Sequence, residues 1–135
     1  KLKQICKNGY FGQIVGKYIA IQTISSSGKS GMTLYRKSDG QKIKTITSNC
    51  SYYEFIDNTF YYVEPIAEFK YKIKSYNIEK KKTITYGTIK ANEFGAITSK
   101  YLYYSNGPMI GECKYYKYSF AKKKSIRITE EAFQY

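Results

Sequence analysis

The chain has 135 residues, which fits one compact module, and 42% of them are hydrophobic, as in globular proteins. The net charge of +13 suggests an acidic partner, such as nucleic acid, an anionic glycan or a membrane surface; the alternative, which we favour over a nucleic-acid site, is a solvated lysine surface. Only Arg36 and Arg127 among the 23 basic residues are arginine, and the basic residues are spread along the chain, which argues against nucleic acid as a partner. No apolar run approaches the roughly 20 residues of a membrane-spanning helix.

The 17 tyrosines favour strands, because a tyrosine ring covers a pleated surface while its hydroxyl reaches water. Cys6, Cys50 and Cys113 are too widely spaced for a zinc or CxxC redox motif. We expect three buried thiols, with one disulfide as the alternative. The first residue is Lys1, not methionine, so we expect that a leader or a larger N-terminal part was removed, and we expect a secreted or cell-surface location.

The first ten residues resemble the end of a later segment. KLKQIC, from Lys1 to Cys6, matches KIKTIT, from Lys42 to Thr47. Residues 1–10 are therefore interpreted as strand d of a preceding unit.

Three repeats of about 42 residues follow, at 11–52, 53–93 and 94–135. Their first halves align three isoleucines and three aromatic residues, namely Ile14, Ile56 and Ile97 with Tyr18, Phe60 and Tyr101. Their second halves align three tyrosines and three isoleucines, namely Tyr35, Tyr76 and Tyr118 with Ile43, Ile84 and Ile126. Two anchors with one period indicate a true internal repeat.

Each repeat is predicted to hold four short strands, a to d, and almost no helix. In the second repeat, strand a lies near 53–56 and an Asp57-Asn58 turn leads into strand b at 59–63. A loop from Glu64 to Lys70 precedes strand c at 71–78, and a turn at 79–81 leads into strand d at about 82–89. Asp39-Gly40 predicts the equivalent c–d hairpin of the first repeat.

These segments resemble β-propeller blades. KYIAI, TFYYV and KYLYY are similar to the second strand of a blade, while TLYRKSDGQKIKTI, IKSYNIEKKKTI and YYKYSFAKKKSI are similar to its third and fourth strands. The resemblance is to the degenerate propellers of bacterial surface and periplasmic proteins, and more distantly to WD-repeat and kelch proteins. Three blades do not close a ring of four to eight, so the resemblance implies a partial propeller or an oligomeric ring. The alternative is a β-trefoil, which the count of three favours.

The sequence offers no catalytic constellation. There is no histidine, which removes the commonest general base and most zinc sites. Gly28-Lys29-Ser30 lacks the earlier glycine of a phosphate-binding loop, and Glu130-Glu131 would point to opposite faces of a strand. We predict no catalytic residue, no cofactor and no metal site.

The loops between strands b and c differ among the repeats, and such loops carry recognition in repeat proteins. The candidate ligand-binding residues are Ser26, Lys29, Glu64, Phe69, Asn106 and Pro108. Tyrosines such as Tyr52, Tyr53 and Tyr103 could stack on a sugar or pack against a protein partner, but for each of them we favour a role in covering contacts between blades.

The leading hypothesis is a non-catalytic binding or scaffold module whose partner is a protein or further blades that complete a ring. One alternative is a trefoil lectin or growth-factor-like domain that binds anionic glycans. The other is a segment of a propeller hydrolase.

Overall fold

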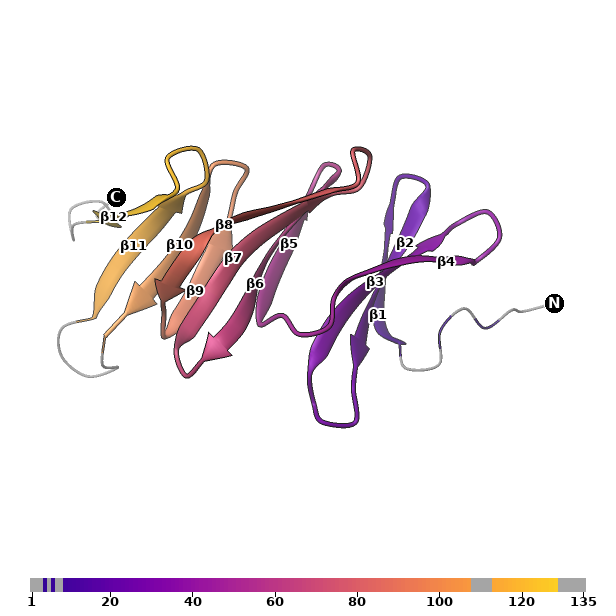
Figure 1. The fold of residues 1–135 in the computed structure, drawn as a ribbon, viewed down its shortest axis with the longest axis horizontal. Coiled ribbons are helices and arrows are strands. Elements are labelled where there is room, and N and C mark those ends of the chain that lie inside the picture. Colours follow the sequence, from indigo (N-terminus) through magenta and orange to yellow (C-terminus); the bar gives the residue numbers. More distant parts are fainter. Residues whose placement is uncertain (1–3, 5, 7–8, 108–112, 129–135) are drawn as a thin grey trace. The chain divides into compact units, whose positions relative to one another are not determined.

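Twelve antiparallel strands and no helix make up the part of the chain that the computed structural model describes, residues 4, 6, 9–107 and 113–128. Figure 1 shows the strands in chain order. The prediction of an all-β chain with three four-stranded units is therefore confirmed. No helix among these residues is long and apolar enough to cross a membrane.

The strands form three sheets, and in each sheet neighbours in sequence are neighbours in space. The first sheet holds β1 (Gly9–Val15), β2 (Tyr18–Ile24), β3 (Ser30–Arg36) and β4 (Lys42–Thr47). The second sheet holds β5 (Tyr52–Ile56), β6 (Thr59–Ala67), β7 (Lys70–Asn77) and β8 (Lys82–Lys90). The third sheet holds β9 (Glu93–Ile97), β10 (Tyr101–Asn106), β11 (Lys114–Ser119) and β12 (Lys124–Ile128).

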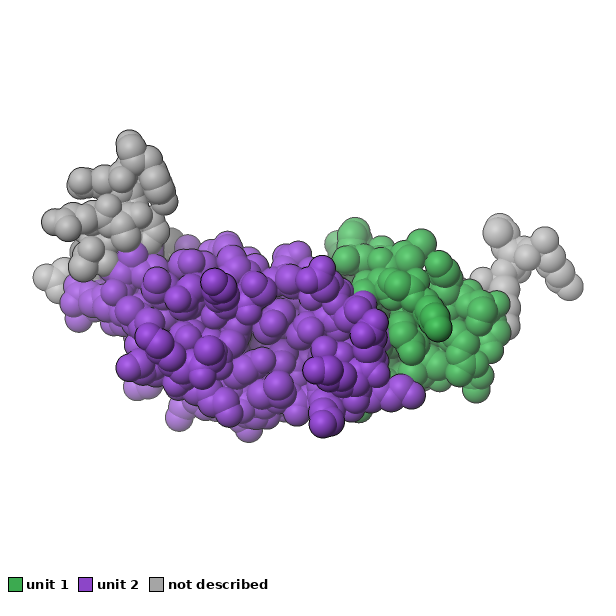
Figure 2. Space-filling model, turned by 90° about the horizontal axis from the view of Figure 1, so that it is seen from above, with its two compact units in different colours: residues 1–51 green, residues 52–135 purple. Residues whose placement is uncertain are grey.

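The chain divides into two compact units, Lys1–Ser51 and Tyr52–Tyr135, which Figure 2 colours separately. The first unit contains the first sheet, in which Ala20 and Leu34 pair across β2 and β3 and are buried on one face. The second unit contains the second and third sheets.

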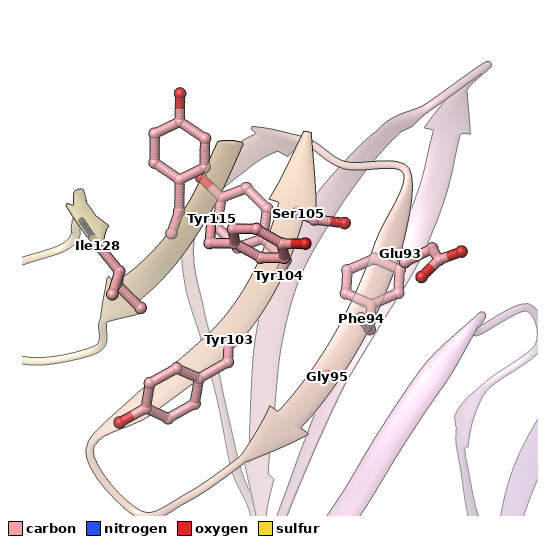
Figure 3. A pocket seen from close by; sticks show the side chains of 9 residues that line it. Glu93, Phe94, Gly95, Tyr103, Tyr104, Ser105, Tyr115 and Ile128 are labelled. Carbon is pink, nitrogen blue, oxygen red and sulfur yellow. The ribbon is translucent and has the colours of Figure 1, made fainter. Parts of the chain in front are cut away.

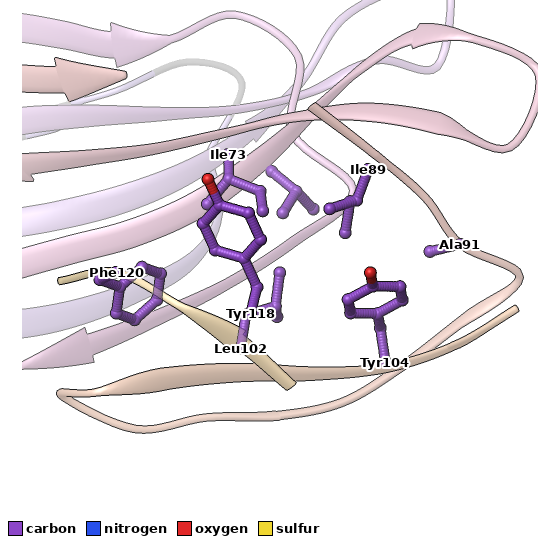
Figure 4. Packing of buried hydrophobic residues seen from close by; sticks show 8 residues of the cluster. Ile73, Ile89, Ala91, Leu102, Tyr104, Tyr118 and Phe120 are labelled. Carbon is purple, nitrogen blue, oxygen red and sulfur yellow. The ribbon is translucent and has the colours of Figure 1, made fainter. Parts of the chain in front are cut away.

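The two sheets of the second unit pack face to face (Figure 4). The second sheet contributes Val63, Ile73 and Ile89, and the third contributes Leu102 and Tyr118, all buried. Alternation along the strands places these side chains on one face of each sheet. The apolar core of this unit therefore lies between its two sheets.

Aromatic rings reinforce this packing. Phe120 stacks on Tyr61 with ring centroids 4.7 Å apart, and it lies 5.0 Å from the ring of Tyr86. Phe94 stacks on Tyr52 at 5.4 Å, and the Tyr52 hydroxyl donates to the carbonyl of Gly95 at 3.2 Å. Tyr52 is half-buried, and its contact with the third sheet agrees with the expectation that such tyrosines cover contacts between blades.

The three c–d hairpins share one turn. The backbone N–H of Gly40, Lys81 or Lys123 donates to the carbonyl four residues earlier, at 2.7 to 2.8 Å. All three residues have positive φ, at 72°, 56° and 54°. Glycine adopts this conformation without steric cost, whereas lysine does not. The predicted turns at Asp39-Gly40, Asp57-Asn58 and 79–81 are confirmed.

Strand pairing confirms one repeat anchor and corrects the other. The three tyrosines pair in the same way in each sheet, Tyr35 with Ile19, Tyr76 with Phe60 and Tyr118 with Leu102. The tyrosines are therefore equivalent to one another, as predicted, and so are their three partners. Phe60 therefore corresponds to Ile19 and Leu102, not to Tyr18 and Tyr101. Likewise Phe55, not Ile56, pairs with Phe60 and corresponds to Ile14 and Ile97. The prediction was wrong by one residue, which assigns side chains to the opposite face of a strand.

Three further predictions need correction. Glu64 to Lys70 is not a loop, because β6 continues to Ala67, β7 begins at Lys70 and only Glu68-Phe69 turn the chain. Gly9 and Tyr10, assigned to a preceding strand d, begin β1, and of the earlier residues only Gln4 and Cys6 are described, outside any strand.

The three cysteines were expected to be buried thiols. None of the three forms a disulfide, but only Cys50 is buried, while Cys6 and Cys113 are half-buried. Cys6 forms a hydrogen bond with Tyr35. Burial and this bond raise the pKa of the Tyr35 hydroxyl to about 12.

Candidate functional site

The predicted b–c residues of the first unit lie in a closed, exposed turn between β2 and β3. Ser26 and Lys29 are both exposed. The N–H of Ser25 donates to the carbonyl of Lys29 at 2.9 Å, and the N–H of Lys29 donates to Ser25 Oγ at 3.1 Å. These bonds hold the turn. Lys29 borders a hollow of about 390 Å³ with a mixed polar and apolar lining that includes Ile24 and Tyr35.

In the second unit, Glu64 has a structural role. It lies within β6, and its carboxylate forms an ion pair with the Lys74 ammonium at 2.8 Å across the β6–β7 ladder. Phe69 lies in the two-residue β6–β7 turn with φ of 56° and is 50% exposed. Asn106 ends β10 and is half-buried, and Pro108 lies outside the described residues.

The connection between β8 and β9 links two edges by hydrogen bonds: the β6–β7 turn of the second sheet and the end of β10 in the third sheet. The N–H of Ala91 donates to the Phe69 carbonyl at 2.9 Å. The N–H of Asn92 donates to the Ser105 carbonyl at 2.8 Å, and Asn92 Oδ1 accepts from the N–H of Gly107 at 2.8 Å. Phe69 and the end of β10 are therefore fixed at one edge of the second unit.

A hollow of about 220 Å³ opens at this edge, bordered by Asn92, Ser105, Gly107 and Cys113. Glu93 and Tyr115 also border it. These two residues and Ser105 line a second hollow as well, so the two hollows are adjacent.

The second hollow, also about 220 Å³, lies on the third sheet (Figure 3). Its lining includes Glu93, Gly95, Tyr103, Tyr115 and Ile128. We call the face of the third sheet that carries Tyr103, Tyr115, Lys117 and Ile128 its outer face, because Leu102 and Tyr118 point to the opposite side, into the core. Strand pairing shows that these side chains share one face, since Tyr103 lies opposite Lys117, and Tyr115 lies opposite Ile128.

The hollow depends on an irregularity in β9. Tyr103 pairs with Ala96 whereas Tyr104 pairs with Phe94, so Gly95 is an extra residue without a cross-strand partner, a β-bulge. Gly95 brings no side chain to the surface, which leaves space beside the Tyr103 ring.

The outer face is aromatic, with Lys117 among its rings and Lys124 at the start of β12. Tyr115 is 45% exposed, and Tyr103 and Ile128 are half-buried. The Lys117 ammonium lies 4.5 Å from the centroid of the Tyr101 ring, a cation–π contact. Among the described residues, no group of three or more His, Cys, Asp or Glu side chains could hold a metal ion. The groups present suit apolar and aromatic contacts with a protein surface.

Sequence reasoning found Tyr103 but missed Tyr115, Lys117 and Ile128 as parts of one surface. A signal was available: Tyr103 and Tyr115 each follow a residue of the second repeat, Tyr61 and Ile73, by 42 positions. What the repeat alone did not show is which face of the last sheet is uncovered.

No protein-family model matches the chain, and a search of curated proteins found no match.

Proposed function

We propose that the chain is a non-catalytic binding module built of propeller-blade-type sheets, and that a protein partner contacts the outer face of the third sheet. The observation that best supports this proposal is the hollow beside Tyr103, Tyr115 and Ile128 on that face. Aromatic residues on a concave patch are typical of protein interfaces.

The arrangement of strands supports blades over a trefoil. Each sheet is a four-stranded meander in chain order, as a blade is, and the two sheets of the second unit stack face to face. A trefoil would join strands of all three repeats in one barrel, whereas the described strands pair only within their own repeat. Because three blades fall short of a ring, further blade-type sheets belong to this proposal.

The test is affinity capture by the immobilised chain from extracts of its source, with matched variants. Tyr115→Glu places a charge in the hollow and is expected to reduce recovery of the partner at least about tenfold, because a buried unpaired charge at an interface costs several kcal/mol. Phe69→Ser removes another exposed aromatic residue, outside the outer face, and is expected to leave capture unchanged. Loss with Phe69→Ser and not with Tyr115→Glu would instead assign binding to the b–c edge, contrary to this proposal.

An anionic glycan is the second candidate, favoured by two lysine-rich turns. Lys80 and Lys81 lie in the β7–β8 turn, and Lys82 begins β8. Likewise Lys122 and Lys123 lie in the β11–β12 turn, and Lys124 begins β12. The two turns are at the same end of the second unit (Figure 1). All six lysines are exposed. Lys81 and Lys123 take the strained conformation that Gly40 takes in the first repeat. Strain kept at exposed charges is consistent with a binding role.

Lys81→Gly with Lys123→Gly separates strain from charge. Relief of strain is expected to stabilise the protein by about 0.5–1 kcal/mol for each substitution, measured by thermal unfolding. If the turns bind glycan, the variant will elute from a heparin column at lower salt. The control, Lys80→Gly with Lys122→Gly, removes the same charge but does not change a residue with positive φ. It should therefore elute at the same salt concentration as the first variant but be less stable than that variant. Unchanged heparin elution in both variants would exclude these turns.

A further inference from the structure

We propose that the partner of the outer face is a second copy of this chain, which docks through its first sheet. This inference rests on the proposed function and names its partner.

That interface supplies the template. The second sheet presents a receiving face with Tyr61, Ile73 and Tyr86. The third sheet presents a packing face with Leu102 and Tyr118 (Figure 4). The Phe120 ring of the third sheet lies against both Tyr61 and Tyr86. The two faces differ, so the contact is head-to-tail and can in principle repeat.

The outer face of the third sheet occupies the register of the receiving face. Tyr103, Tyr115 and Ile128 follow Tyr61, Ile73 and Tyr86 by 42 residues each. Tyr103 therefore corresponds to Tyr61, one of the two rings that hold Phe120. Ile128 pairs with Tyr115 as Gly87 pairs with Ile73, so it takes the place of Gly87, next to the second ring, Tyr86. Tyr103 and Ile128 both line the open hollow. The hollow lies where an apolar side chain of a further sheet would enter.

The first sheet carries a second packing face. Ile14, Ile19, Ile21 and Tyr35 precede Ile97, Leu102, Tyr104 and Tyr118 by 83 residues each, and pairing confirms that Ile14 and Tyr35 flank Ile19 as Ile97 and Tyr118 flank Leu102.

Part of this face is accessible, whereas Tyr35 is only 8% exposed and is hydrogen-bonded to Cys6. Ile14 is 67% exposed, and Ile19 and Ile21 are half-buried beside a hollow of about 340 Å³. Tyr10 and Phe11, which border the same hollow, are 73% and 58% exposed. One chain thus offers both halves of a head-to-tail contact, and two chains would supply six blade-type sheets, within the four to eight of a propeller.

Polar replacements and charge make the new contact weaker than the template. Ser105 stands where the receiving face has Val63, and Lys117 where it has Ser75. Each copy also carries a net charge of +13, so two copies repel one another. Added salt screens this repulsion. Self-association should therefore strengthen with salt, the opposite of binding to an anionic glycan.

The test is the solution mass of the purified chain, measured by sedimentation equilibrium over a range of protein concentrations at low and high salt. The mass is expected to rise with concentration, and more so at high salt. Tyr115→Glu and Ile14→Glu are each expected to weaken association at least about tenfold. Both residues are exposed, so both variants should keep the wild-type melting temperature. Phe69→Glu, on neither face, is the control and should associate as wild type does.

Mixing the two variants tests the head-to-tail geometry. The Tyr115→Glu chain keeps its packing face, and the Ile14→Glu chain keeps its outer face, so an equal mixture is expected to form a dimer that neither variant forms alone. A chain that stays monomeric under all conditions, or a mixture that does not dimerise, overturns the proposal. If the chain is monomeric while capture of a different protein still depends on Tyr115, the proposed function stands and only self-association fails.

Discussion

Leu102→Ala is expected to destabilise the second unit by about 2–5 kcal/mol, because it removes a fully buried side chain from the core between the two sheets. Leu102 is 0% exposed and packs in one cluster with Val63 and Ile73 of the second sheet. Tight packing limits how far the surrounding side chains can move into the cavity. Small domains have only about 5–15 kcal/mol of stability, so this loss is a large fraction of the total.

Urea unfolding followed by circular dichroism measures the loss. Ile84→Ala is the matched control, since Ile84 is an aliphatic strand residue that is 46% exposed, and its cost should stay within about 0.5 kcal/mol. Leu102→Met, which conserves volume, should cost less than about 1.5 kcal/mol. A Leu102→Ala cost no larger than that of Ile84→Ala would contradict face-to-face packing of the two sheets.

Local chemistry made the strands and turns predictable. Aromatic and β-branched runs indicated the strands, and Asp57-Asn58 and Asp39-Gly40 indicated hairpins, because such residues suit tight turns. The tyrosine anchor at Tyr35, Tyr76 and Tyr118 gave the right register because each tyrosine stands a few residues before a c–d turn of constant length.

The register error at Phe60 has a different origin. In the second repeat the residue after the a–b turn is Thr59, while Tyr18 and Tyr101 hold this place in the other repeats. Matching aromatic residues by type therefore displaced the alignment by one position. Pairing across β6 and β7 fixes the register, and that information is not local.

The expected loop at Glu64 was misleading because charge and Pro65 both argue against a strand. β5 ends its pairing opposite Val63, so β6 has an open edge beyond that residue. An open edge tolerates proline, which lacks an N–H. The outer face could not be predicted either, because its exposure depends on which sheet covers which, and no local pattern records that.

Gly87→Ala and Tyr118→Phe are expected to be strongly coupled, and this is the second large effect. A Cβ atom on Gly87 would lie 2.6 Å from the Tyr118 hydroxyl oxygen, closer than real contacts allow. Tyr118 is buried, so its ring has little room to move, and Gly87→Ala should cost about 1–3 kcal/mol.

The Tyr118 hydroxyl itself is unfavourable. It is buried and has no hydrogen-bond partner among the described residues, and an unsatisfied buried polar group costs about 1–3 kcal/mol. Tyr118→Phe should therefore be neutral or stabilising. Burial, with the nearby Tyr104 and Tyr86 hydroxyls, raises the pKa of Tyr118. The unfolded chain thus ionises first, and the stability present below about pH 10 is lost as pH rises further. Tyr118→Phe should lessen that alkaline loss.

The double variant decides whether the two positions act on each other. Without the hydroxyl, the nearest ring atom to the new Cβ is Cζ at 3.5 Å, an ordinary contact. Gly87→Ala should then be nearly neutral in the Tyr118→Phe background, and alanine in a strand also loses less backbone entropy on folding than glycine. A double-mutant cycle from urea unfolding should give a coupling energy of about 1–3 kcal/mol. Simple additivity would mean that the close approach of β8 to the Tyr118 hydroxyl is wrong, and with it the depth at which the third sheet packs on the second.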